Sequence, residues 1–209
     1  MRRRPQWETR KLQDTTPSKK LIWSEIRWSV ITSFFFAIPG AIMIESWKLG
    51  GTKIYTDYAK YGWIYLFLSI FIYMFLHDTY FYWTHRLMHR PKIFRIFHQV
   101  HHESQNPTPW AAFSFHPYEA IIEALILPLL TFFVPIHIGA LIFVLTAMTI
   151  FGVTNHTGYE IFSAKWMQGL WGKQMITATH HNQHHKNYFC NFGLYFRFWD
   201  KFMQTDKMT

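Results

Sequence analysis

Long apolar blocks without charge alternate with basic, histidine-containing segments along this chain. The first block covers 29–44 (SVITSFFFAIPGAIMI) and the second covers 61–76 (YGWIYLFLSIFIYMFL). Each is a little shorter than the ~20 residues of a straight membrane span. Flanking aromatic residues extend both blocks into the interface, where tryptophan and tyrosine concentrate. The pattern predicts two transmembrane helices that form a first hairpin.

A third apolar block, 120–154, has about twice the length of one span. Pro135 and Gly139 interrupt it near the middle, so we expect a turn over 134–138 between two helical arms. Glu123 lies inside the first arm, and a carboxylate at membrane depth usually faces a bundle interior or lies near the interface. The block predicts a second transmembrane hairpin.

Four spans would put both termini and the segment between the hairpins on one side of the membrane. Eighteen of the 21 lysines and arginines fall on that side, which the positive-inside rule makes cytoplasmic. The basic amino-terminal segment does not resemble a cleaved signal peptide. We therefore expect one all-α integral membrane domain of about four transmembrane helices in two hairpins, with a histidine-rich helical cap on the cytoplasmic side that holds a di-metal site. We expect a single domain over 1–209. It comprises a basic amino-terminal segment (1–25), the first hairpin (26–76), a segment with the first two histidine motifs (77–119), the second hairpin (120–154) and the cap with the third motif (155–209).

Composition and charge exclude several other classes of protein. Half of the 209 residues are apolar and 20% are aromatic, which excludes a disordered chain. The formal net charge of +9 does not indicate nucleic-acid binding, because the lysines and arginines lie between apolar spans rather than clustering on a soluble fold. The single cysteine, Cys190, excludes an internal disulfide and a cysteine-based zinc or iron–sulfur site.

Thirteen histidines are an unusual number for a chain of this length. His85 and His89, in HRLMH, are four residues apart and so share one face of a helix. HQVHH (98–102) and HNQHH (181–185) each place histidines at i, i+3 and i+4. Packing so many imidazoles near a bilayer without metal would leave their nitrogens unpaired or charged. The three motifs therefore predict a metal site.

The number of nitrogens indicates two ions, since a tetrahedral zinc uses only about four ligands. Imidazole binds iron, zinc, copper and nickel, so the ligand type does not choose the metal. Two redox-active ions suit oxygen activation, whereas two zinc ions suit hydrolysis. The chain has neither a serine nucleophile elbow nor an HExxH motif. A zinc-dependent membrane hydrolase or isomerase is the alternative function, and a metal-binding transport or structural protein is a third.

Other polar side chains near the three motifs are candidates as ligands or as hydrogen-bond partners of ligands. At ~100° per residue, Asp78 lies within ~20° of His85 around a helix, whereas His77 is rotated ~80° away. His137, in the expected turn, is expected to be structural. The candidates beyond the motifs are Asp78, His77, His116, Glu160 and His180.

The three motifs resemble the histidine boxes of the sterol desaturase and fatty acid hydroxylase superfamily. Their surroundings agree over roughly 76–205: DTYFYWTHRLMHRP, FHQVHHES, NPTPWAAFSFHPYEA, NHTGYE and HHNQHHKNYFCNFGLYFRFWDKFMQT. The NPTP to FHP run and the NFG to WDK run are most similar to the C-5 sterol desaturase branch. The resemblance implies a non-haem di-iron centre that uses O2 and two electrons to hydroxylate or desaturate a sterol-like or fatty acyl lipid. By position, the ligands would be His85, His89, His98, His101, His102, His181, His184 and His185, with His156 as a ninth.

Two departures argue against narrower branches. Phe81 stands where the methylsterol oxidase branch has a histidine, and Glu160 stands where the fatty acid 2-hydroxylase branch repeats one. No catalytic side chain is expected beyond the metal ligands. No HPGG haem-binding motif is present, so we expect a separate electron donor, either a cytochrome b-type protein or a ferredoxin with an NAD(P)H reductase. We expect a multi-pass protein with cytoplasmic termini, in the endoplasmic reticulum of a eukaryote or the inner membrane of a bacterium.

Overall fold

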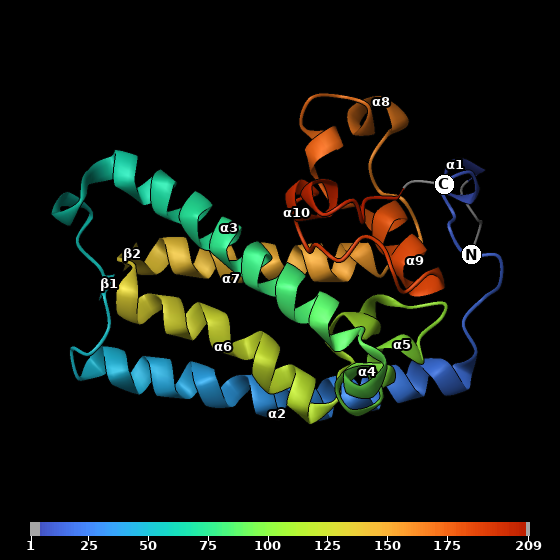
Figure 1. The fold of residues 1–209 in the computed structure, drawn as a ribbon. Helices are drawn as coiled ribbons and strands as arrows, with labels where there is room; N and C mark the ends of the chain where they lie inside the picture. Colours follow the sequence, from blue (N-terminus) through green and yellow to red (C-terminus); the bar gives the residue numbers. More distant parts are fainter. Residues whose placement is uncertain (1–4, 208–209) are drawn as a thin grey trace.

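Four long helices form the body of the molecule (Figure 1). The structure is a computed structural model that describes residues 5–207; Arg2, Arg3 and Arg4 of the basic amino-terminal segment lie outside the described residues. The long helices are α2 (Lys19–Lys48), α3 (Gly62–Met88), α6 (Pro117–Phe133) and α7 (Ile138–Asn155). In Figure 1 they lie roughly along one direction, with α6 beside α2 and α7 beside α3. The fold is helical, as the sequence predicts.

Three of these helices, α2, α3 and α7, are long and apolar enough to cross a membrane. They present many large apolar side chains outward, which is what a lipid-facing surface requires. The fourth, α6, has 17 residues, or ~26 Å at 1.5 Å per residue, against the ~30 Å of a hydrocarbon core. Residues 5–207 thus contain three clear candidate spans, which indicates a membrane protein.

One end of the bundle is closed by a small sheet and a hydrophobic core. Strand β1 (Ile54–Tyr55) pairs in parallel with β2 (Ile136–His137), and so joins the α2–α3 connection to the turn between α6 and α7. That turn lies where the sequence predicts it, because α6 ends at Phe133 and α7 begins at Ile138. The buried side chains here are Ile54, Tyr73, Leu127, Ile136, Ala140, Leu141 and Val144.

The other end carries the short elements (Figure 1). These are α1 (Pro5–Glu8), α4 (Pro91–Phe97), α5 (Gln99–His102), η2 (Pro109–Phe113), α8 (Ala164–Met167), η3 (Gly172–Gln174), α9 (Ala178–Lys186) and α10 (Phe198–Phe202), while η1 (Tyr58–Lys60) lies in the α2–α3 connection. Their connections bring segments that are far apart in the sequence onto the carboxyl-terminal ends of α3 and α7.

The amino-terminal segment helps to hold this end together. The backbone N–H of Leu12 donates to the carbonyl of Gly158 at 2.9 Å, and the side chain of Gln13 donates to the carbonyl of Pro107 at 2.7 Å. Gly158 has φ +71°, and a Cβ there would lie 2.6 Å from the Gln13 side chain. Only glycine satisfies both the left-handed backbone and this close approach.

Candidate metal centre

Nine buried histidines at this end of the bundle form two adjacent groups. Within each group the ligand nitrogens all lie within 4.8 Å of one another. Group 1 contains His85, His89, His98, His102 and His184, and group 2 contains His101, His156, His181 and His185. The structure thus brings together the eight histidines of the three motifs and His156.

Helical periodicity explains how each motif divides between the groups. Residues i+3 and i+4 are ~100° apart around a helix and lie on opposite sides of residue i, so they can face two different ions. His98 and His102 accordingly share group 1 while His101 joins group 2. In the third motif, His181 and His185 share group 2 while His184 joins group 1. Helices α5 and α9 each serve both groups.

The imidazole nitrogens of each group face one another. In group 1 the Nε2 of His89 lies 3.3 Å from the Nε2 of His85 and 3.2 Å from that of His102. The Nε2 of His184 is 3.1 Å from the Nε2 of His102. In group 2 the Nε2 of His181 lies 2.8 Å from that of His156 and 3.1 Å from that of His185. Converging Nε2 atoms are the arrangement that ligation of an ion requires.

Hydrogen bonds at the opposite ring nitrogen fix the orientation of several of these rings. The Nδ1–H of His85 donates to the carbonyl of Phe192 at 2.8 Å. His156 donates in the same way to the carbonyl of Gly152, and His184 to that of Cys190, both at 2.7 Å. Because Nδ1 carries the proton, Nε2 keeps its lone pair free for a metal.

His98 has a carboxylate in place of a carbonyl as its partner. Its Nδ1 lies 2.5 Å from Oε1 of Glu119, and both side chains are almost fully buried. A carboxylate partner orients the ring and increases its basicity as a ligand. Glu119 is a partner that the three histidine motifs do not indicate, although its position three residues after His116, in the first turn of α6, was a signal in the sequence.

Burial keeps the cluster uncharged. Desolvation lowers the pKa of the six histidines of the second and third motifs well below its ordinary value, and neighbouring imidazoles lower it further. Burial also lowers the pKa of His156 to about 4. These rings are therefore neutral at pH 7, which is the form that binds metal ions.

The two groups open onto a cavity between the long helices. Its wall includes histidines of both groups, among them His85, His98 and His156. The remaining wall is mostly aromatic and apolar, including Phe36, Phe81, Phe113, Phe115 and Met148. A mostly apolar cavity with a few polar side chains is the usual form of a small-molecule site.

Comparison with known proteins places this site in a family. The family model for fatty acid hydroxylases matches residues 70–205, which contain all nine histidines. The chain belongs to the fatty acid hydroxylase family. No solved structure matches it.

The curated relatives of this fatty acid hydroxylase family member include sterol enzymes. It is 31% identical to the Delta(7)-sterol 5(6)-desaturase ERG3B of Gibberella zeae over 82% of this chain and 53% of that protein. It is 26% identical to the lathosterol oxidase of Rattus norvegicus over 88% of this chain and 60% of that protein. It thus spans little more than half the length of these relatives. They confirm the resemblance to the C-5 sterol desaturase branch.

Asp78 of this fatty acid hydroxylase family member lies in neither histidine group. Its Oδ1 accepts the backbone N–H groups of Leu194 at 3.0 Å and Tyr195 at 2.7 Å. These contacts join α3 to the loop that contains Phe192, whose carbonyl holds His85. Asp78 therefore acts on the site by fixing this loop.

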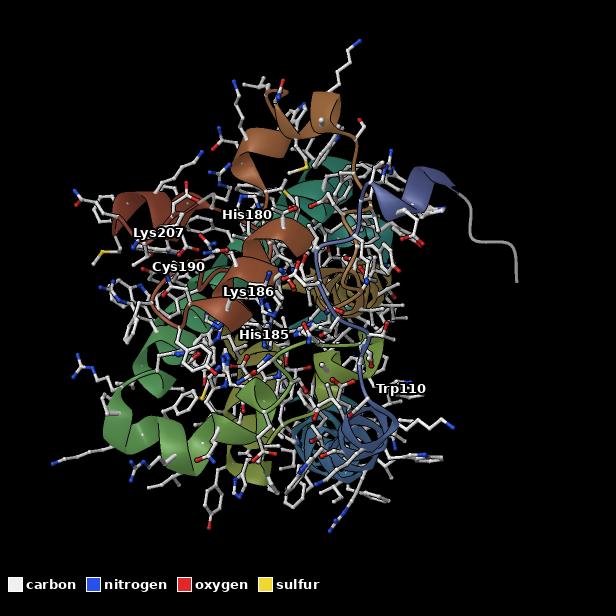
Figure 2. All side chains as sticks on the ribbon, turned by 90° about the vertical axis from the view of Figure 1, so that its right-hand side faces the viewer. Trp110, His180, His185, Lys186, Cys190 and Lys207 are labelled. Carbon is white, nitrogen blue, oxygen red and sulfur yellow. The ribbon has the colours of Figure 1, made fainter. Side chains whose placement is uncertain are left out.

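The four other candidates also lie outside both groups. His116 caps α6, where its Nδ1 accepts from the backbone N–H of Tyr118 at 3.3 Å. Glu160 accepts from the backbone and hydroxyl of Thr179 at 3.1 and 2.6 Å, at the start of α9. His180 shares a capping box with Thr177, and Figure 2 shows it near one end of α9, with His185 near the other. His77 lines the cavity.

Proposed function

We propose that this protein is a membrane-bound, non-haem di-iron oxidoreductase that hydroxylates or desaturates a lipid with O2 and two electrons. The observation that carries the proposal is the pair of buried histidine groups beside an apolar cavity. The printed names of the relatives, desaturase and oxidase, agree with this reaction class.

The residues present fit two iron ions. Five neutral imidazoles in group 1 and four in group 2 supply nitrogen donors of the kind that iron accepts. Hydrogen bonds from Nδ1 orient the ring in His85, His98, His156 and His184. Bound there, the irons would supply the activation of dioxygen and the oxidation of a C–H bond.

The chain itself contributes position and exclusion of water. The apolar wall of the cavity removes water from the lipid segment that lies against the histidines, and limits side reactions. Aromatic side chains such as Phe81 and Phe115 restrict where that segment lies. Holding one C–H group next to the oxidant converts a bimolecular encounter into a step within one complex. We assign no acid–base role to a side chain beyond the ligands.

We propose a topology of four spans, in which α6 is the fourth and the histidine groups lie at the cytoplasmic rim. The proposal is supported by the distribution of lysines and arginines along the sequence and by the position of the histidines at the bundle end opposite β1 and β2. The substrate would enter from the bilayer. Electrons would come from a separate carrier protein on the cytoplasmic side.

Lipid analysis of a host with and without the protein tests this function. The host receives iron and an electron donor, and its lipids are compared by mass spectrometry. Hydroxylation adds one oxygen atom to a lipid, and desaturation removes two hydrogen atoms. Either change, dependent on iron and O2, supports the proposal. Unchanged lipids with iron bound and reductant present would contradict it, and activity with zinc alone would favour the hydrolase alternative.

A further inference from the structure

Three polar side chains line the cavity in addition to the histidine groups. They are His77, Glu119 and Glu123, which are 2%, 1% and 8% exposed. They come from two helices, α3 and α6, that meet over the cavity. The rest of the wall outside the metal ligands is almost wholly apolar. Such isolated polar groups in an apolar chamber usually orient a ligand.

These groups have hydrogen-bonding capacity that the described residues leave unused. The Nδ1 of His77 and the Oε2 of Glu119 are buried without a hydrogen-bond partner among residues 5–207. Glu123 lies in the same cavity wall and is 8% exposed. Each unpaired buried polar group costs about 1–3 kcal/mol, and nearly all buried polar groups in proteins have partners. A ligand in the cavity would supply these partners.

Glu123 also marks the junction of two cavities. A second cavity between α2, α6 and α7 shares Phe36, Glu123 and Met148 with the chamber at the histidines. Apart from Glu123 its wall is apolar, with Gly40, Met43, Ala124, Leu127, Pro128, Leu141 and Leu145. Glu123 follows Glu119 by four residues, ~6 Å along the helix axis, and Glu119 touches His98. A ligand group at Glu123 would therefore lie near the metal centre, with an apolar space beyond it.

We propose that Glu123, together with His77, binds a hydroxyl group of the lipid substrate. This inference rests on the proposed function, which it deepens by naming the substrate class as neutral lipid alcohols. A hydroxyl group can donate to the carboxyl oxygen and accept from the imidazole N–H at the same time. The reacting carbon would lie within a few bonds of the hydroxyl, toward the histidines, and the apolar remainder would occupy the second cavity.

Charged headgroups fit this cavity less well than a neutral hydroxyl does. A phosphate or a free carboxylate would lose its hydration against a wall that is mostly aromatic and apolar, at a cost in desolvation. A protonated amine would lie beside the proposed metal ions, which are positive. A neutral hydroxyl avoids both penalties. Sterols and long-chain alcohols are two kinds of lipid that carry one on a large apolar body.

Equilibrium binding without turnover tests the proposal. The full-length, iron-loaded protein is kept anaerobic and unreduced, and two fluorescent probe pairs are titrated. One pair is a sterol with a free 3-hydroxyl group and its 3-methyl ether; the other is a long-chain alcohol and its methyl ether. The methyl ether keeps the shape but cannot donate a hydrogen bond. We expect wild type to bind one of the two alcohols about tenfold more tightly than its ether, and that pair identifies the lipid kind.

Variants assign the effect to one residue. Glu123→Leu should reduce the alcohol-to-ether ratio to about one, and Glu123→Gln should retain a part of it. Glu45→Gln is the matched control, because it makes the same chemical change at an exposed carboxylate that pairs with Lys48, and it should leave the ratio unchanged. Iron content, measured on each variant, should stay at the wild-type value.

Three results would overturn the hydroxyl site: equal affinity of wild type for alcohol and ether in both pairs, no binding of any probe, or an unchanged ratio in Glu123→Leu. The protein could also bind an alcohol more tightly than its ether and yet show no O2-dependent oxidation of any lipid. That result would support the hydroxyl site and contradict the proposed function. Conversely, lipid oxidation by a protein that does not distinguish alcohol from ether would support the function and overturn the site.

Discussion

The Nδ1 of His98 lies 2.5 Å from the Oε1 of Glu119, in a contact between residues 21 positions apart. Glu119 lies in the first turn of α6, while His98 caps the short helix α5. The contact holds the His98 ring so that its Nε2, which has no hydrogen-bond partner among the described residues, faces group 1. It therefore links the long-helix bundle directly to the proposed ligands.

We predict that Glu119→Leu weakens iron binding by about 10–100-fold, because the orienting partner of a ligand is lost. Glu119→Gln, whose amide oxygen can still accept from Nδ1, should lose less. Competition with an iron chelator measures the affinity of each variant. Glu45→Gln, at an exposed site, is the control. Wild-type affinity in Glu119→Leu would show that this contact does not support a ligand.

Alanine at a ligand should remove iron and activity together. His184→Ala deletes a nitrogen from group 1 and His101→Ala deletes one from group 2. Metal analysis and turnover of the purified proteins measure both effects. His116→Ala is the control, since His116 caps α6 and lies in neither group; it should keep two irons and lose about 1 kcal/mol of stability. Two irons and full turnover in His101→Ala or His184→Ala would contradict the ligand assignment.

Asp78 should matter for stability more than for ligation. Asp78→Ala leaves the backbone N–H groups of Leu194 and Tyr195 without their acceptor, at a cost of about 3 kcal/mol. Asp78→Asn keeps one acceptor oxygen and should lose less, while retaining two irons per chain. Thermal unfolding in detergent, combined with metal analysis, separates the two effects. Loss of iron from a well-folded Asp78→Asn protein would argue for a direct role at the metal.

Acid should destabilise the metal-free protein. Burial lowers the pKa of the histidines of the second and third motifs and of His156 in the folded state, so below about pH 6.5 the unfolded chain binds more protons. Stability is then fully present above that pH and is lost as pH falls toward 4. Each such histidine contributes up to ~1.4 kcal/mol per pH unit. A melting temperature that is the same at pH 7.5 and 5.5 would contradict this.

The sequence was sufficient to place the histidines of each motif close together, because local spacing determines which of them share a turn of helix. Histidines at i, i+3 and i+4 stack on a short helix wherever that helix lies, and the boxes resemble those of a known family. The turn at 134–138 was also predicted from local sequence, because Pro135 disfavours a continuous helix at this point. Proline alone does not decide this, since Pro39 and Pro128 lie inside α2 and α6. The apolar blocks likewise identified α2, α3 and α7.

Contacts between segments far apart in the chain could not be predicted from the sequence. The pairing of His98 with Glu119 depends on how α6 packs near α5, and the pairing of His85 with the carbonyl of Phe192 depends on a loop that Asp78 holds. Helical geometry placed Asp78 on the same face of α3 as His85. It could not show that the Asp78 carboxyl group accepts hydrogen bonds from backbone N–H groups of a distant loop instead. The division of nine histidines into five and four also required the three-dimensional arrangement.

Anomalous diffraction at the iron absorption edge, from crystals of anaerobically purified protein, shows directly whether each histidine group holds an iron ion. We expect two iron peaks per chain, one among His85, His89, His98, His102 and His184 and the other among His101, His156, His181 and His185. A single peak shared by both groups, or no iron in either group of an active protein, would contradict it.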